Sequence, residues 1–334
     1  MKAIQERQVF DLKLSFVNVG YGESIVVQSG GSVVVIDGGP NRPEVYEQPG
    51  TMRLTEYLRR EGIRRIDCMV ITHIHEDHIA GLVPVVEEME VGEIWCNVLP
   101  EGDVEGMLDC LKPSISTLSQ RLYFAAWKSY AAIRRLAAAR GIPMREMPGD
   151  GSCFRFGELS LTLLGMDAGA VADCRARLEE MLCERNLERL SRMFQKNDAT
   201  CNQTSLAVKL DGGGLRALLT GDLVDGWDGL RARYDLTAEV LKVTHHGQRN
   251  GMSQAMLEGA DPSVIVICAD RDRTFNSAHP EIIGRAEQYL TERKRFPRIY
   301  ITGRLFAGER LGSALEVEPG ESCANPKTSI KLYA

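Results

Sequence analysis

Short runs of apolar, often β-branched residues recur along the chain and are separated by glycine-containing turns. The first three runs, at 11–19, 24–28 and 32–39, predict a meander of β-hairpins and not a βαβ opening. The same pattern predicts later strands near 66–71, 94–98, 152–164 (as a hairpin), 205–210, 215–220, 239–244, 264–268, 298–303, 314–318 and 328–333. Helices are expected at 51–62, 78–89, 226–234 and 281–293. This pattern of strands and helices therefore predicts a protein of the α+β class.

Two segments interrupt the strand pattern with apolar residues at helical spacing, at about 103–140 and 168–198. We expect both to be helical insertions in a single domain spanning residues 1–334. The aromatic residues Phe124, Trp127 and Tyr130 in the first segment are expected to pack between helices. A wall on which a substrate stacks is the alternative.

Composition and charge narrow the class of protein. Of the 334 residues, 44% are hydrophobic and 26% charged, which is typical of a soluble globular protein. The net charge of −6 means that any nucleic-acid contact would depend on a local basic patch. Nine cysteines without a C-x-x-C pair indicate reduced thiols. No signal-peptide core is seen at the start, and no apolar run approaches the roughly 20 residues that span a bilayer, so we expect a cytoplasmic protein without membrane contact.

Metal-ligand chemistry is concentrated at residues 72–78, T-H-I-H-E-D-H, which follow an apolar strand. His73 and His75 alternate in an extended segment, so both can reach one point. Asp77 is expected at the N-cap of the following helix, with His78 in its first turn directed toward a second point. Imidazole and carboxylate ligands of this kind suit zinc, manganese or iron.

The other histidines and two acids also follow predicted strands. Asp37, Asp222, the pair His245–His246 and His279 each lie at a strand end or in the loop just after one. Side chains collected from several strand ends are the arrangement that an active site requires.

These motifs resemble the metallo-β-lactamase superfamily, an αββα sandwich of hydrolases. The superfamily motif H-x-H-x-D-H is matched by His73, His75, Asp77 and His78. The resemblance implies a strand-end acid at Asp37, a bridging carboxylate at Asp222 and a last histidine at His245 or His246. Within the superfamily the chain is similar to the hydrolase domain of ComEC-type DNA-uptake competence proteins and their stand-alone relatives. That similarity rests on the motifs at 16–24, 36–39, 202–206, 218–222, 241–247 and 278–280.

The resemblance implies two divalent ions, Zn or Mn, with His73, His75 and Asp222 on the first ion. Asp77, His78, Asp222 and His245 would bind the second. No histidine lies between His78 and His245, so the third histidine of many superfamily members is missing and a single-metal protein is an alternative. Asn18, Tyr21 and Gln248 also depart from the subgroup pattern, which bears on the substrate.

The function expected from this resemblance is a metal-dependent phosphodiesterase or nuclease acting on DNA or another nucleic acid through a metal-bridged hydroxide. Asp77, His246 and His279 are the candidate catalytic residues, and Asp37 would orient a ligand histidine. For His279, a purely structural role at a helix start is the alternative.

Two other functions remain open from the sequence. The substrate could be a small phosphodiester, such as a cyclic nucleotide or a choline-phosphate ester, or else a thioester or a lactam, because a fold does not determine a substrate. The chain could also be a non-catalytic subunit with a vestigial metal site that binds a protein partner through the helical insertions.

Overall fold

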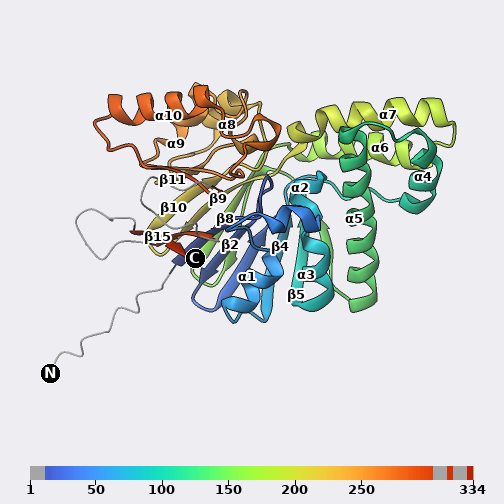
Figure 1. Ribbon diagram of the computed structural model, residues 1–334, viewed down its shortest axis with the longest axis horizontal. Helices are drawn as coiled ribbons and strands as arrows, with labels where there is room; N and C mark the ends of the chain where they lie inside the picture. The colour runs from blue at the N-terminus through green and yellow to red at the C-terminus, as the bar shows by residue number, and fades with distance from the viewer. Residues whose placement is uncertain (1–11, 304–313, 319–328, 334) are drawn as a thin grey trace.

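The computed structural model describes residues 12–303, 314–318 and 329–333 (Figure 1). The first of its two sheets begins with the predicted antiparallel meander and continues as parallel strands. Val26 pairs with Ser15 on one side and Val35 on the other, whereas Val35 pairs with Met69 in parallel register. The strand order is β15, β14, β1, β2, β3, β4, β5, β6. The bounds are β1 Leu12–Val17, β2 Ile25–Ser29, β3 Ser32–Ile36, β4 Arg65–Ile71, β5 Glu90–Cys96, β6 Met144–Glu146, β14 Ala314–Glu318 and β15 Ser329–Tyr333.

The second sheet has the order β13, β12, β11, β10, β9, β8, β7. Its antiparallel part contains β7 Asp150–Phe156, β8 Leu159–Leu164, β9 Ala207–Gly212 and β10 Leu215–Leu219. Its parallel part contains β11 Val240–Lys242, β12 Val264–Ile267 and β13 Ile299–Ile301. The strands expected near 152–164, 205–210 and 215–220 are all present.

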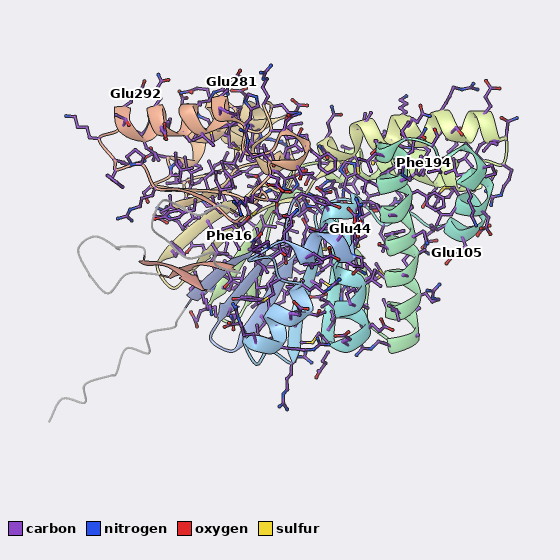
Figure 2. All side chains as sticks on the ribbon, viewed as in Figure 1. Phe16, Glu44, Glu105, Phe194, Glu281 and Glu292 are labelled. Atoms are coloured by element: carbon purple, nitrogen blue, oxygen red, sulfur yellow. The ribbon has the colours of Figure 1, made fainter. Side chains whose placement is uncertain are left out.

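Helices cover the outer faces of both sheets, so the molecule has four layers. The helices α1 Leu54–Arg60, α2 Glu76–Ile79 and α3 Leu82–Glu88 share one apolar cluster with the first sheet. The helices α8 Trp227–Arg233, α9 Gln254–Ala260 and α10 Pro280–Glu292 share another with the second sheet. A third cluster, which includes Phe16 (labelled in Figure 2) and Leu161, fills the space between the sheets. Apolar side chains are thus buried at three interfaces: between the sheets, and between each sheet and its helices. Burial at these interfaces produces the predicted αββα arrangement.

The two helical segments lie together at one end of the sandwich (Figure 1). They form α4 Val104–Leu111, α5 Leu118–Arg140, α6 Ala168–Cys183 and α7 Leu187–Thr200. Trp127 and Tyr130 are fully buried, as the helix-packing interpretation predicted. Phe194 of α7, labelled in Figure 2, packs its ring 4.7 Å from that of Tyr123 on α5.

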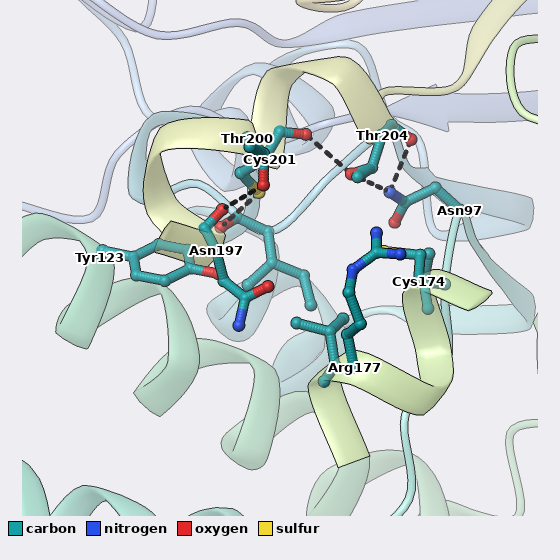
Figure 3. A pocket seen from close by; sticks show the side chains of 11 residues that line it. Asn97, Tyr123, Cys174, Arg177, Asn197, Thr200, Cys201 and Thr204 are labelled. Carbon is teal, nitrogen blue, oxygen red and sulfur yellow. Dashed lines mark hydrogen bonds between the residues drawn. The ribbon is translucent and has the colours of Figure 1, made fainter. Parts of the chain in front are cut away.

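Polar contacts join this helical block to the sheets. Figure 3 shows Asn97, which follows β5, donating from Nδ2 to the carbonyl oxygen and the Oγ1 of Thr204, at 2.8 and 2.9 Å. Beside them is a cavity of about 20 Å³ that is also lined by Arg177 of α6 and Tyr123. Because side chains of α5, α6 and the segments after β5 and α7 meet here, the block is fixed against the sandwich.

Several expected boundaries were wrong. The helix expected at 78–89 is two helices, because the chain bends at Gly81 to pass Gly38; a Cβ on Gly81 would lie 2.0 Å from the Gly38 oxygen. The N-cap of α2 is His75 and not Asp77, since the extended conformation continues through His75 (ψ 152°). The helical segment expected at about 168–198 is broken between α6 and α7, where Asn186 Oδ1 accepts from the Arg189 amide at 3.0 Å and caps α7. Strand β6 and helix α9 were not predicted.

In the part of the chain that the structure describes, no helix combines the length and apolar character needed to cross a bilayer.

Candidate metal centre

The turn after β4 brings His73, His75 and His78 to one place. His73 Nε2 lies 3.0 Å from His75 Nδ1, so both nitrogens are directed toward one point, as the alternation in the sequence predicted. His73 Nδ1 lies 3.0 Å from the Thr72 hydroxyl oxygen. Because Thr72 donates its own proton to Asp37, its oxygen accepts from His73 and leaves the Nε2 lone pair of His73 free.

Asp37, at the end of β3, holds this turn in place. Its Oδ1 accepts from the Thr72 amide at 2.9 Å, and its Oδ2 accepts from the Thr72 hydroxyl at 2.6 Å and from His78 Nδ1 at 2.7 Å. The backbone of Asp37 lies in the left-handed region (φ 56°), a conformation that costs free energy for a residue with a side chain. The carboxylate that orients His78 is therefore set by both backbone and hydrogen bonds.

Asp222 enters the site from the loop after β10. Its carboxylate is buried, and its Oδ2 lies 3.4 Å from His78 Nε2 and 4.0 Å from His73 Nε2. On the other side, Asp222 Oδ1 lies 3.8 Å from the ammonium of Lys242 and has no hydrogen-bond partner. Lys242 forms a fully buried ion pair with Glu23 and donates to the Gly221 carbonyl at 2.8 Å. The signal for this pair in the sequence is a lysine within an otherwise apolar strand.

Of the two histidines after β11, His246 is the one that reaches the cluster. Its Nε2 lies 3.1 Å from Asp77 Oδ2, 3.1 Å from His78 Nε2 and 3.5 Å from Asp222 Oδ2. Its Nδ1 donates to the Cys268 carbonyl at 2.9 Å, and a carbonyl can only accept, so Nε2 carries the lone pair.

His245 is turned away from this cluster. Its Nε2 accepts from Asn202 Nδ2 at 3.0 Å, and its Nδ1 donates to Asn250 Oδ1 at 2.9 Å. Both His245 and His246 have left-handed backbone (φ 50° and 51°), so the alternation of an extended strand does not continue through the pair. Of the two histidines that the resemblance left open, His246 lies beside Asp77 and Asp222, whereas the metal role expected for His245 stays a prediction.

The donor set fits divalent metal ions. Two groups, His73–His78–Asp222 and Asp77–His78–His246, each present ligand atoms within 4.8 Å of one another. The Nε2 atoms of His78 and His246 are 3.1 Å apart, so a proton or a cation must lie between two lone pairs that would otherwise repel. Neutral imidazoles with carboxylates are the ligands that zinc and manganese take.

Electrostatic effects in the cluster favour ionised carboxylates. Burial would raise the pKa of Asp222, but His246 and His78 hold it well below its ordinary value. Burial, together with His78 and His75, lowers the pKa of His73 well below its usual range. The pKa of His78 is shifted in the opposite direction: burial would lower it, but Asp222, Asp37 and Asp77 outweigh burial and raise it. A divalent ion at this point would replace the proton that these carboxylates hold on His78.

A carboxylate from the second helical segment contacts the outer side of His75. Asp198 Oδ1, on α7, lies 3.3 Å from His75 Nε2, the nitrogen that faces away from His73. The hydroxyl of Ser119, at the start of α5, donates to Asp198 Oδ2 at 2.6 Å. Both helical segments therefore reach the metal-ligand cluster, and no motif in the sequence indicated Asp198 or Ser119.

A cleft of about 290 Å³ opens beside the cluster. Its lining residues are Tyr21, His75, Glu76, Asp77, Leu118, Ser119, Leu122, Tyr123, Asp198, Gln248 and Phe275. Of the three departures noted in the sequence, Tyr21 and Gln248 line this cleft, whereas Asn18 binds the Gly50 carbonyl in a buried loop.

His279 lies outside the cluster, in a wider hollow with Gln248, Arg249, Asn250 and Asn276. Its Nδ1 accepts from the Glu281 amide at 3.3 Å and caps α10. The helix-start role is thus what its hydrogen bonds show, and its catalytic role stays a prediction.

A family model, a curated relative and several solved structures are similar to this chain. A family model described as the metallo-beta-lactamase superfamily matches residues 17–174. The chain has the metallo-beta-lactamase fold. The resemblance predicted from the histidine motif is confirmed, and the match supports a metal-dependent hydrolase of this superfamily.

One curated relative is ComE operon protein 3 of Bacillus subtilis strain 168, which is 20% identical over 284 residues, or 81% of this chain. The chain spans only 30% of the length of that relative. Among solved structures, it is similar to Igni18, a metallo hydrolase of the archaeon Ignicoccus hospitalis, at 14% identity and a TM-score of 0.47, covering 91% of this chain and 98% of that one. It is also similar to CmlA, a diiron β-hydroxylase of Streptomyces venezuelae, at 12% identity and a TM-score of 0.46, covering 87% of this chain and 52% of that one.

Proposed function

We propose that this chain is a metal-dependent phosphodiesterase. The observation that carries the proposal is the convergence of Nε2 atoms from three histidines on the carboxylates of Asp77 and Asp222 at the edge of a cleft. His73, His75 and Asp222 would hold a first divalent ion, and Asp77, His78, His246 and Asp222 a second. Zinc and manganese are the ions proposed.

When bound, divalent ions at such a site neutralise phosphate oxygens and lower the pKa of water toward 7, which supplies a nucleophile at neutral pH. The residues of the chain fix where this happens. Asp37 keeps a proton on His78 Nδ1, the Cys268 carbonyl keeps one on His246 Nδ1, and both Nε2 lone pairs consequently face the site. Asp198 orients His75 from behind, in the manner of carboxylates that hold metal-ligand histidines.

Cleavage of DNA or another nucleic acid is the more specific form of this proposal, and it rests on the resemblance to the competence-type hydrolase domain. A small phosphodiester is the second candidate, and the cleft favours it. The residues lining the cleft include the acids Glu76, Asp77 and Asp198 but neither lysine nor arginine, which a polyanion would need.

The test incubates the full chain with Mn²⁺ or Zn²⁺ and either bis(p-nitrophenyl) phosphate or labelled single- and double-stranded DNA. We expect metal-dependent hydrolysis of a diester that is lost in Asp77→Ala and retained in the matched variant Asp211→Ala, whose side chain is exposed on β9. Hydrolysis of thioesters or lactams without any diester cleavage would contradict the proposal. An inert protein that copurifies with a stable partner would favour the non-catalytic alternative.

A further inference from the structure

Exposed large hydrophobic side chains gather beside the metal centre. Among the described residues, only four large hydrophobic side chains are exposed: Leu118 (46%), Leu187 (38%), Phe275 (40%) and Phe296 (82%). Two of these, Leu118 and Phe275, line the cleft that the metal-ligand cluster borders. Apolar surface left in contact with water at a cleft is typical of a place where a ligand covers it.

Phe275 is held in its exposed position at a conformational cost. Its backbone has φ 58°, in the left-handed region that a bulky residue rarely adopts. The preceding turn is fixed by Asp270, whose carboxylate accepts from the amide (2.8 Å) and the hydroxyl of Thr274. Strain of this kind is retained where surrounding structure imposes it, and such positions cluster at ligand sites.

Tyr21 supports the ring of Phe275 from the sandwich side. The two rings meet edge to face with centroids 5.4 Å apart. Tyr21 is itself fixed, because its hydroxyl donates to Glu76 Oε2 at 2.8 Å. An aromatic wall is therefore already in place on this side of the cleft.

Another part of the cleft wall comes from the start of α5. Leu118 and Leu122 line the cleft together with Tyr123, whose ring is 5.7 Å from that of His75. Thr117 caps the helix just before Leu118, and its Oγ1 accepts from the Gln120 amide at 3.2 Å. The aliphatic wall is thus as well anchored as the aromatic one.

The residues that line the cleft do not provide a partner for a second anionic group next to the reacting phosphate. They include the carboxyl side chains of Glu76, Asp77 and Asp198, and neither lysine nor arginine is among them. The volume of about 290 Å³ lies at the small end of the range for ligand pockets, roughly 300–1,000 Å³. An uncharged group of the size of an aryl ring or a nucleoside suits this space.

We propose that the cleft is a subsite for an uncharged aromatic arm of the substrate, packed against Phe275 and Leu118 while the phosphate lies at the metal centre. This inference rests on the proposed phosphodiesterase function and names its substrate class: small phosphodiesters with an aromatic ester arm.

Binding of two phosphonates to the metal-loaded full chain tests the subsite without requiring turnover. Phenylphosphonate and methylphosphonate share a head group and differ only in the arm, and calorimetry measures each Kd. We expect phenylphosphonate to bind about 3- to 10-fold more tightly, the range that an aromatic contact supplies. Phe275→Ala and Leu118→Ser should each reduce that preference and leave methylphosphonate binding unchanged. The matched control Phe296→Ala, at an exposed phenylalanine outside the cleft, should keep the preference.

The outcomes separate the subsite from the phosphodiesterase function. Equal binding of the two phosphonates by a protein that hydrolyses bis(p-nitrophenyl) phosphate would refute the subsite and leave the phosphodiesterase intact. A preference that depends on Phe275, in a protein that cleaves no diester, would support the subsite and refute the proposed activity. Failure to bind either phosphonate would refute the subsite, and the hydrolysis assay would then decide the phosphodiesterase function by itself. A preference unaffected by both cleft variants would also overturn the subsite.

Discussion

The metal-ligand cluster and the cleft wall beside it are built in different ways. His73, His78 and Asp222 are buried and are held by hydrogen bonds that start from the ends of sheet strands. Leu118 and Phe275 are exposed and come from the start of α5 and from a strained turn. Under the functions proposed above, the buried part would determine what chemistry is available, and the exposed part would determine which substrate can use it. A division of this kind allows a fold to keep its reaction while its substrate changes.

The largest effect is expected from removing His246. His246→Ala deletes an Nε2 that lies 3.1 Å from Asp77 Oδ2, so metal content measured by elemental analysis should fall and hydrolysis should drop to background. His245→Ala is the matched control, because the ring of His245 is engaged by Asn202 and Asn250. Loss of metal in His245→Ala with retention in His246→Ala would reverse the placement of the two histidines.

Removing the buried cation behind Asp222 should cost stability. Lys242→Met leaves Glu23 buried without its partner, which typically lowers the free energy of unfolding by about 3–5 kcal/mol. The double variant Glu23→Gln/Lys242→Met should recover part of this loss in urea unfolding. Lys209→Met, which breaks an ion pair with the exposed Asp235, should cost less than about 1 kcal/mol. A Lys242→Met protein as stable as Lys209→Met would show that the buried pair contributes little.

A smaller effect is expected where the helical insertions reach the metal ligands. Asp198→Asn keeps the shape of the side chain but removes the charge beside His75 Nε2, so metal affinity should fall by about 10- to 100-fold. Competition with a chromophoric chelator measures that affinity, and the visible spectrum of the cobalt-substituted protein should change because His75 is less firmly oriented. Asp173→Asn on α6, which is exposed and distant from these contacts, is the control. Unchanged affinity and spectrum would mean that Asp198 only packs α7 against the turn.

The smallest effect should come from loosening the aliphatic wall. Thr117→Ala removes the N-cap of α5 and should lower the free energy of unfolding by about 1 kcal/mol. The buried ligands are not held by this cap, so metal content should stay at the wild-type level. A loss of bound metal in Thr117→Ala would show that wall and cluster are more closely coupled than their separate supports indicate.

The sequence by itself determined most of the elements and the types of candidate ligand. The period-two runs predicted the strands, because a half-buried strand needs that alternation, and H-x-H-x-D-H placed His73, His75 and His78 together because the motif spans one strand-to-helix turn. Only the tertiary structure decided that His246 reaches Asp77 in place of His245, since two left-handed residues rotate the pair. It alone brought Asp198 and Leu118 to the site, because helices inserted far along the chain have no local pattern that records where they pack. Local interactions involve residues that are neighbours in the sequence, so the sequence pattern predicts them. Contacts between distant segments depend on how buried surfaces fit together in the folded protein.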